Sequence, residues 1–217
     1  MAYLELFDRV ADHVRRQGVE ATLTRGKPLT TSEIEEARAK TVICIPDAMA
    51  AFYIEVGDGM QFYWNAKGKR APFANHEFPK LSDLMVESHD KLRWRTEWDD
   101  SYDFRFTKNP TLAKQTAVRM RKWTSFHDEG DGDEISLDTD LNPPPVVFNR
   151  HDWYDGGTGE NGHRLANSLL QFYEDWSQVC FQFPSSLWWP SVFSKAGPGV
   201  DWNSVEFCEP FRLRDGL

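Results

Sequence analysis

Residues 45–64 read IPDAMAAFYIEVGDGMQFYW and predict a helix, a tight turn and a strand in direct succession. Pro46 can open the helix, because proline fits the first helical turn, where its missing N–H would have had no partner. Four large apolar side chains then share one helical face, namely Met49, Phe52, Tyr53 and Val56. Gly57 ends the helix, and Asp58–Gly59 is a turn dipeptide. Alternation over residues 60–64 predicts a strand with one apolar side, so we expect structural roles for Pro46, Phe52, Gly57 and Gly59.

The rest of the chain supplies further helices and strands. Helices are expected over residues 3–16, 32–40, 81–92, 109–122 and 165–176, the second of them opened by a capping box of Ser32 and Glu35. Strands are expected over residues 102–106, 134–138 and 146–148, the last two as a hairpin-like pair. Residues 65–80 carry few strand signals and are interpreted as a loop. We expect the strands of residues 60–64 and 134–148 to share one sheet.

Length and charge narrow the possible functions. A chain of 217 residues is long enough for one domain with a sizeable core. With 25 basic and 34 acidic residues the formal charge is 25 − 34 = −9, which argues against general nucleic-acid binding and favours a basic partner. No run of about 18 apolar residues is present. Glu5 and Asp8 lie where a signal peptide would be positively charged, so we expect a cytoplasmic protein that does not enter a membrane.

Three cysteines, Cys44, Cys180 and Cys208, are widely separated and form no CxxC motif. An odd number of scattered thiols suits reduced, buried cysteines better than a disulfide framework or a zinc site. A bridge between Cys180 and Cys208 is the alternative.

An acidic segment with two glycines leads into the strand expected at residues 134–138. Its seven acids, in thirteen residues without a base, are Asp128, Glu129, Asp131, Asp133, Glu134, Asp138 and Asp140. Oxygen ligands suit calcium, but the spacing of an EF-hand fails from Asp128 and from Asp131 alike. The segment is therefore either a solvated turn or a surface that binds a basic partner. The candidates for partner binding are Asp128, Glu129, Asp131, Asp133 and Glu134.

Tryptophan is unusually frequent, with nine copies in the chain. Large rings fill protein cores, and they also anchor interfaces when a partner buries them. Core packing is the simpler interpretation for the clustered residues. The candidate interface anchors are Trp94, Trp98, Trp188 and Trp189.

Motifs for catalysis or cofactor binding are weak. Residues 157–162 fit GxGxxG, but no strand leads directly into them, as a dinucleotide site requires. His151, Asp152 and His163 could meet at a metal, yet without clustered ligand spacing they are more simply structural. The basic segment 108–122 could bind nucleic acid, although beside the acidic segment it also forms a self-complementary surface. We therefore expect no catalytic residue, no metal and no cofactor.

The order of several short motifs resembles the SUKH superfamily, which joins fungal cell-wall assembly regulators to bacterial immunity proteins. The resemblance covers roughly residues 30–177, with an aromatic insertion between two motif blocks and a C-terminal extension. The matching pieces are Ser32–Glu35, Ile45–Pro46, Phe52, Gly57–Gly59, Gly132–Asp138, Pro145–Phe148, His151–Asp152 and the helix with Phe172 and Trp176. Gly132, Asp138 and His151 are thereby expected to be structural. The chain departs from the family in having Asp58–Gly59 where Asn-Gly is common.

The resemblance implies a single α+β domain, in which helices flank a mostly antiparallel sheet. It also implies a protein that binds another protein and is not an enzyme. In the bacterial branch that partner would be a toxin, and the charge of −9 suits a basic, nuclease-like one. The alternatives are a regulatory scaffold of the same fold, or a small metal-dependent hydrolase that uses residues 127–138 or 151–163.

Overall fold

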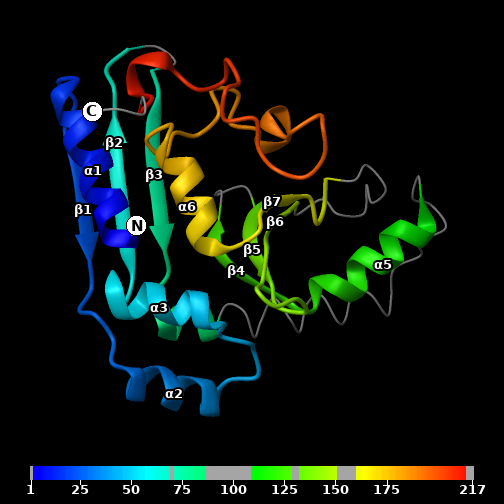
Figure 1. The fold of residues 1–217 in the computed structure, drawn as a ribbon. Coiled ribbons are helices and arrows are strands. Elements are labelled where there is room, and N and C mark those ends of the chain that lie inside the picture. Colours follow the sequence, from blue (N-terminus) through cyan, green and yellow to red (C-terminus); the bar gives the residue numbers. More distant parts are fainter. Residues whose placement is uncertain (1, 69–70, 87–108, 129–131, 151–159, 214–217) are drawn as a thin grey trace.

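Two antiparallel sheets organise the protein (Figure 1). The computed structural model describes residues 2–68, 71–86, 109–128, 132–150 and 160–213. The first sheet has the order β1-β2-β3, and its strands are β1 (Ala21–Arg25), β2 (Met60–Asn65) and β3 (Phe73–Phe78). The second has the order β4-β5-β6-β7, and its strands are β4 (Trp123–Asp128), β5 (Glu134–Asp138), β6 (Val146–Asn149) and β7 (Arg164–Ala166). The protein therefore has an α+β fold, as expected from the sequence.

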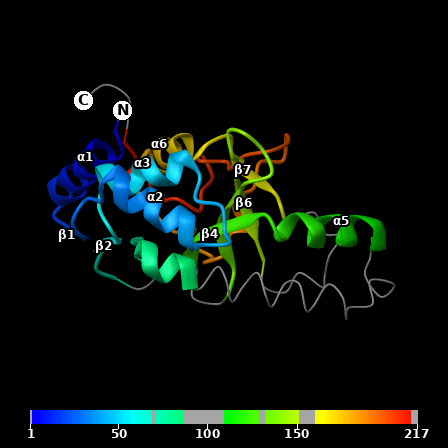
Figure 2. The ribbon, with the colours of Figure 1, turned by 90° about the horizontal axis from the view of Figure 1, so that it is seen from below.

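Helices pack on both sheets and at their ends. They are α1 (Tyr3–Arg16), α2 (Thr31–Lys40), α3 (Asp47–Glu55), residues 81–86, α5 (Pro110–Met120) and α6 (Leu169–Ser177), with short 3-10 turns at η3 (Trp189–Val192) and η4 (Glu209–Phe211). Helix α1 runs along the first sheet, α6 lies between the two sheets, and α3 crosses the end of the first sheet (Figure 1). Seen from below, α5 extends from the second sheet at the end of the molecule opposite α1 (Figure 2). Within the part of the chain described, no helix is long and apolar enough to cross a membrane.

One hydrophobic core joins both sheets. Buried side chains of α1, α3, α6, β2, β3, β5 and β6 belong to a single cluster. At its centre the Phe52 ring of α3 stacks on Phe78 of β3, with ring centroids 4.0 Å apart, and on Tyr173 of α6 at 5.4 Å. Aromatic pairs of this kind add about 0.5–1.5 kcal/mol each beyond the area that they bury. Phe52 therefore has the structural role that the helical periodicity predicted.

The helix, turn and strand predicted for residues 45–64 are confirmed. Pro46 is the N-cap of α3, and β2 alternates buried and exposed residues along its whole length. Gly57 has a positive φ of 142°, and a Cβ built on it would lie 2.3 Å from the carbonyl oxygen of Gly26. The Gly26 N–H in turn donates to the Gly59 carbonyl at 2.9 Å. The turn thus fits tightly against the end of β1, which explains why residues 57 and 59 are both glycine.

Several sequence-based expectations were wrong. Residues 65–80 are not a loop, because they contain β3, and the two motif blocks lie in separate sheets of the described chain. The capping box of α2 is Thr30 with Glu33, whose carboxylate accepts the Thr30 N–H at 2.7 Å, so the helix begins earlier than Ser32. Strands β1, β4 and β7 were not anticipated, and the start of the helix expected from Leu165 belongs to β7.

The remaining helices and strands follow the sequence pattern where they are described. Helices α1 and α5 and strands β5 and β6 have the expected positions, and β5 pairs with β6 as a hairpin would. The helix expected at residues 81–92 is present over 81–86. The strand expected at residues 102–106 and the glycine motif up to residue 159 lie outside the described residues. The cysteines are all free, but Cys44 is exposed, so the expectation that all three are buried was wrong.

Candidate functional site: a cleft between the two sheets

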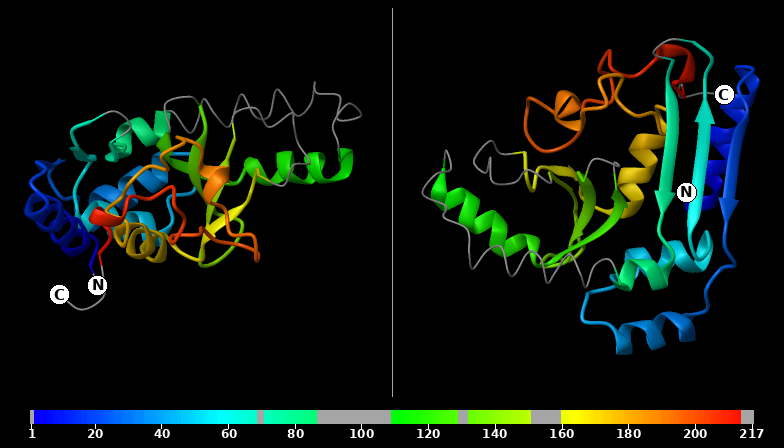
Figure 3. Two further views of the ribbon diagram at one scale, coloured as in Figure 1. Left: turned by 90° about the horizontal axis from the view of Figure 1, so that it is seen from above. Right: turned by 180° about the vertical axis from the view of Figure 1, so that it is seen from behind.

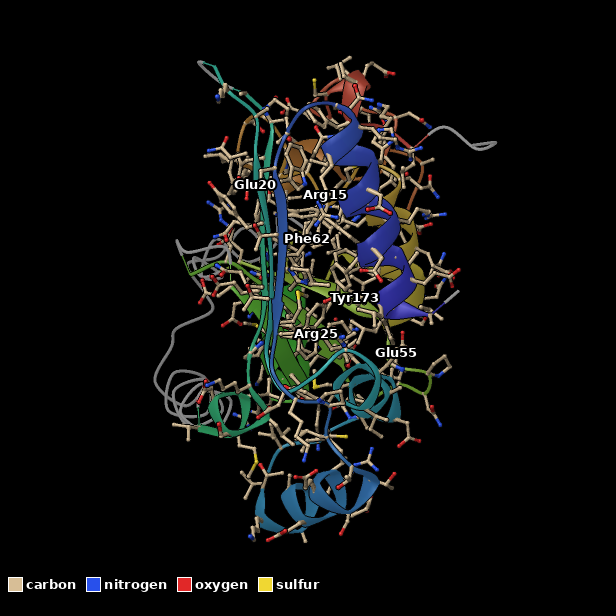
Figure 4. The ribbon with its side chains drawn as sticks, turned by 90° about the vertical axis from the view of Figure 1, so that its left-hand side faces the viewer. Arg15, Glu20, Arg25, Glu55, Phe62 and Tyr173 are labelled. Atoms are coloured by element: carbon tan, nitrogen blue, oxygen red, sulfur yellow. The ribbon has the colours of Figure 1, made fainter. Side chains whose placement is uncertain are left out.

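A cleft of about 1030 Å³ opens where the first sheet meets the second. It extends along the solvent face of β3 to the far end of β4, and the residue pair Phe183 and Leu187 closes one side. Its size is at the upper end of the range for ligand pockets, about 300–1000 Å³. Viewed along the first sheet, Phe62 and Tyr173 lie on the side of α1, whereas Glu20 lies on the opposite, solvent side (Figure 4). The cleft is on this solvent side of the sheet.

Alternation along β3 supplies one wall. Ala74, His76 and Phe78 are buried, whereas Phe73, Asn75 and Glu77 alternate with them and line the cleft, which Phe78 also contacts. This arrangement follows from the two-residue period of a strand, which sends successive side chains to opposite faces. The outward side chains of Asn75 and Glu77 are exposed. The strand thus faces the hydrophobic core on one side and offers polar groups to a ligand on the other.

A bulge in β4 supplies the floor. Ser125 pairs with Ser136 of β5 and His127 pairs with Ile135, so Phe126 is an extra residue in β4. A bulge bends the strand and redirects its side chains, which explains how the consecutive residues 125–128 all line the cleft.

A left-handed turn after α6 positions the aromatic side of the cleft. Cys180 and Phe181 have φ values of 55° and 57°, and the Trp64 indole N–H donates to the Cys180 carbonyl at 2.9 Å. Non-glycine residues adopt this left-handed conformation rarely, and the hydrogen bond from Trp64 helps to hold the turn in it. The turn directs the chain back to β3, where the Phe183 N–H donates to the Phe73 carbonyl at 3.1 Å. The stacked rings of these two phenylalanines, 5.3 Å apart, form the aromatic end of the cleft.

Two histidines connect the sheets beneath the cleft. The Nδ1 atoms of His76 in β3 and His127 in β4 lie 3.2 Å apart, and His76 Nε2 is 2.7 Å from the Tyr173 hydroxyl. Burial, reinforced by the neighbouring His127 ring, holds the pKa of His76 well below its ordinary value. Burial also raises the pKa of the Tyr173 hydroxyl well above its usual range. His76 and Tyr173 are therefore both neutral near pH 7, which suits structural hydrogen bonding better than proton transfer.

The walls of the cleft carry more acids than bases. The acids are Asp58, Glu77, Asp83 and Asp128, and the bases are Arg25 and Lys80. Some of these groups already have structural partners, since Asp58 Oδ1 accepts the Leu81 N–H at 2.7 Å and Arg25 donates to the Val56 carbonyl at 3.1 Å. Glu77 is exposed, and among the described residues its carboxylate accepts one hydrogen bond, from the Gln61 side chain at 2.8 Å. The cleft thus favours a positively charged occupant.

The acidic segment of the sequence divides into a surface part and a buried part. Asp128 is exposed and lines the cleft. Asp133 and Glu134 are only 3% and 5% exposed, so their carboxylates do not form the acidic surface that we expected. Glu134 Oε2 accepts hydrogen bonds from Ser125 at 2.6 Å and from Asn149 at 2.8 Å, which makes it an internal acceptor of the second sheet. The other members of the expected set, Glu129 and Asp131, lie outside the described residues.

The candidate tryptophans also have different environments. Trp189 is buried in η3 and packs on Trp176, with ring centroids 5.4 Å apart, so it is a core residue and not an exposed anchor. Trp188 is half-buried, and the Arg150 guanidinium carbon lies 4.9 Å from the centre of its ring. Neither lines the cleft. Trp94 and Trp98 lie outside the described residues.

The motif residues have structural positions where they are described. Gly132 has a φ of 97°, which favours glycine, at the turn into β5. Asp138 is fully buried, and its carboxylate accepts a hydrogen bond from Arg119 of α5. His151 lies outside the described residues.

Sequence reasoning did not find Asn75, His76 or Glu77. The only signal was the alternation of polar and apolar residues between Pro72 and Pro79, which was too irregular to predict a strand. Among the described residues no group of three or more His, Cys, Asp or Glu side chains could hold a metal ion. Comparisons with protein-family models, curated proteins and solved structures found no significant match for this chain.

Proposed function

We propose that this chain is a non-enzymatic protein-binding domain of the SUKH type, and specifically an immunity protein that neutralises a basic toxin by binding to it. The observation that supports the proposal most directly is the acidic cleft between the sheets, with four carboxylates against two basic groups. The cleft is negatively charged, as is the whole chain, whose net charge is −9. Charges of the same sign at both levels favour long-range attraction of a basic partner. A nuclease toxin fits, because its own surface must attract phosphate.

Co-expression with the neighbouring toxin-like reading frame tests the proposal. We expect a stable complex on affinity purification and rescue of growth in cells that make the toxin. The charge-reversal variant Glu77→Lys/Asp83→Lys should weaken both, since it places two cations in the cleft. Asp8→Lys, on the exposed side of α1, is the matched control and should retain rescue. If no neighbouring reading frame gives a complex and none allows rescue of growth, the proposal is ruled out.

The regulatory scaffold remains the second candidate for the same fold. A gene neighbourhood without toxin-like reading frames, together with co-purification of an endogenous partner that needs Glu77 and Asp83, would favour it. Both functions use the cleft in the same way, so the charge-reversal variant is informative for either.

A further inference from the structure

The main-chain groups of β3 alternate between its sheet partner and the outer edge of the strand. The Pro72 carbonyl faces β2, where it accepts the Ala66 N–H at 3.1 Å. The Phe73 carbonyl faces away from β2 and accepts the Phe183 N–H at 3.1 Å. The Glu77 carbonyl also faces away, because His127 Nδ1 approaches it at 3.3 Å. In an antiparallel strand this alternation places both polar groups of every second residue on the outer edge.

Asn75 lies midway between Phe73 and Glu77 and has the same orientation in the strand. Its main-chain N–H and C=O therefore point outward from the free edge of β3, away from β2. Neither group takes part in the ladder with β2, and in the described parts of the chain no hydrogen bond joins either of them to another residue. The Asn75 side chain is exposed, and its one hydrogen bond within the described residues is a long one, from the Gln61 amide at 3.4 Å. An unpaired strand edge is a template for another strand, and proteins normally cover it or place charges on it.

Residues of this edge also line the cleft. They are Phe73, Asn75 and Glu77, and Phe183 and His127 close the edge on either side of Asn75. The open length therefore suits a short extended segment rather than a long strand. Glu77 beside the edge and Asp83, which also lines the cleft, favour basic side chains in that segment.

We infer that the cleft accepts an extended, lysine- or arginine-rich segment of the partner protein, which adds to β3 as a further strand and pairs with Asn75. The inference rests on the proposed function, whose partner it specifies. Main-chain hydrogen bonds to Asn75 fix the register of the added segment, and carboxylates at the cleft select its charge. The histidine contact to Glu77 and the Phe183 contact to Phe73 set the limits of the segment.

A synthetic peptide tests strand addition independently of any toxin. The probe is the acetylated and amidated pentapeptide Lys-Thr-Lys-Val-Lys, which matches the five positions from Phe73 to Glu77, titrated into ¹⁵N-labelled protein. We expect amide shifts centred on Asn75 and Glu77, and hydrogen exchange at the Asn75 N–H slowed by about tenfold or more at saturation. Two peptides N-methylated at alternate residues provide the matched pair. One of them removes the N–H groups that face β3 and should bind at least about tenfold more weakly, whereas the other should bind as before.

Protein variants complete the experiment. Asn75→Pro removes the edge N–H, and Glu77→Lys reverses a charge on the exposed surface, where it should not disturb folding. Both should weaken peptide binding by about fivefold or more, while Asp8→Lys should change it by less than about twofold. No shifts at Asn75 and Glu77, or equal affinity for the two N-methylated peptides, would overturn strand addition. A toxin complex that forms and survives Asn75→Pro would leave the proposed function intact but refute this mode of binding.

Discussion

The Nδ1 atoms of His76 and His127 meet at 3.2 Å across the junction of two sheets that share no main-chain ladder in the described chain. One Nδ1 must donate and the other must accept, so the accepting ring has to be neutral for the contact to form. Protonating the accepting ring would set two N–H groups against each other in the core. The contact that joins the sheets is thus sensitive to acid.

Lowering the pH should therefore destabilise the fold. The unfolded chain binds a proton at His76 near pH 6.5, whereas the folded chain, with its lowered pKa, does not until the pH is lower. Stability from this residue is complete above about pH 6.5 and is lost as the pH falls below it, by at most about 1.4 kcal/mol per pH unit. Urea titrations between pH 7.5 and 5.5 should show this slope in the wild type, and His76→Gln should reduce it. Tyr173→Phe, which keeps the histidine pair, should lower stability but retain the slope, and a flat wild-type profile would contradict the prediction.

The close fit of Gly57 against Gly26 predicts a large cost for adding one methyl group. A Cβ at Gly57 would lie 2.3 Å from the Gly26 carbonyl oxygen, and the positive φ disfavours a side chain as well. Gly57→Ala should lower the free energy of unfolding by about 3 kcal/mol or more, measured by urea denaturation. Gly18→Ala is the matched control, because Gly18 has a φ of 77° with nothing within 4 Å of its added Cβ. Its cost should be about 1 kcal/mol, and equal losses for the two variants would show that the contact is unimportant.

Asp58 connects the turn after α3 to the helical residues 81–86. Its Oδ1 accepts the Leu81 N–H at 2.7 Å, so it acts as a helix cap from a distant part of the chain. Asp58→Ala should lower the free energy of unfolding by about 0.5–2 kcal/mol, whereas Asp58→Asn, which keeps an acceptor, should lose less. Hydrogen exchange at the Leu81 amide provides the direct measurement. Unchanged protection of this amide in Asp58→Ala would contradict the capping role.

Thiol chemistry should separate the three cysteines. Cys44 is exposed and Cys208 half-buried, whereas burial raises the pKa of the Cys180 thiol to about 12. A disulfide reagent should modify Cys44 fastest in the folded protein and Cys180 only after unfolding, because the thiolate is the reactive form. Cys44→Ser should remove the fast phase without changing stability. Modification of Cys180 at the rate of Cys44 in native protein would show that the core opens there.

The sequence predicts the fold well where local signals agree with tertiary ones. The segment from Pro46 to Trp64 has a helix start, an apolar face and a turn that all favour one structure, and β5 has a clear apolar pair, Ile135 and Leu137. In strand β3 the local and tertiary signals disagree. The polar His76 is buried and the apolar Phe73 faces the cleft, the reverse of what a polar and an apolar residue would suggest. Tertiary packing decides such cases, as β propensity depends strongly on context.

The candidate site was harder to predict than the fold. In β4 the extra residue Phe126 breaks the two-residue period, so the strand and its cleft-lining side chains could not be recognised. Glu134 lies in an acidic run that suggests solvent exposure, yet its carboxylate is enclosed by Ser125 and Asn149 from neighbouring strands. Which strands form one sheet depends on contacts between residues far apart in sequence. No local pattern records that β3 and β4 meet through side chains.

The shape of the cleft depends on the side chains that pack where β3 meets β4. The views from above and from behind show the two sheets as separate layers with α6 between them (Figure 3). Packed side chains such as Phe78 and Phe126, with ring centroids 5.7 Å apart, set the angle between these layers in place of a shared hydrogen-bond ladder. A substitution that changes the size of these side chains would widen or narrow the cleft while the register of every strand is kept. Substitutions at these rings would thus change the shape of the cleft without altering the polar residues of its walls, such as Asn75 and Glu77.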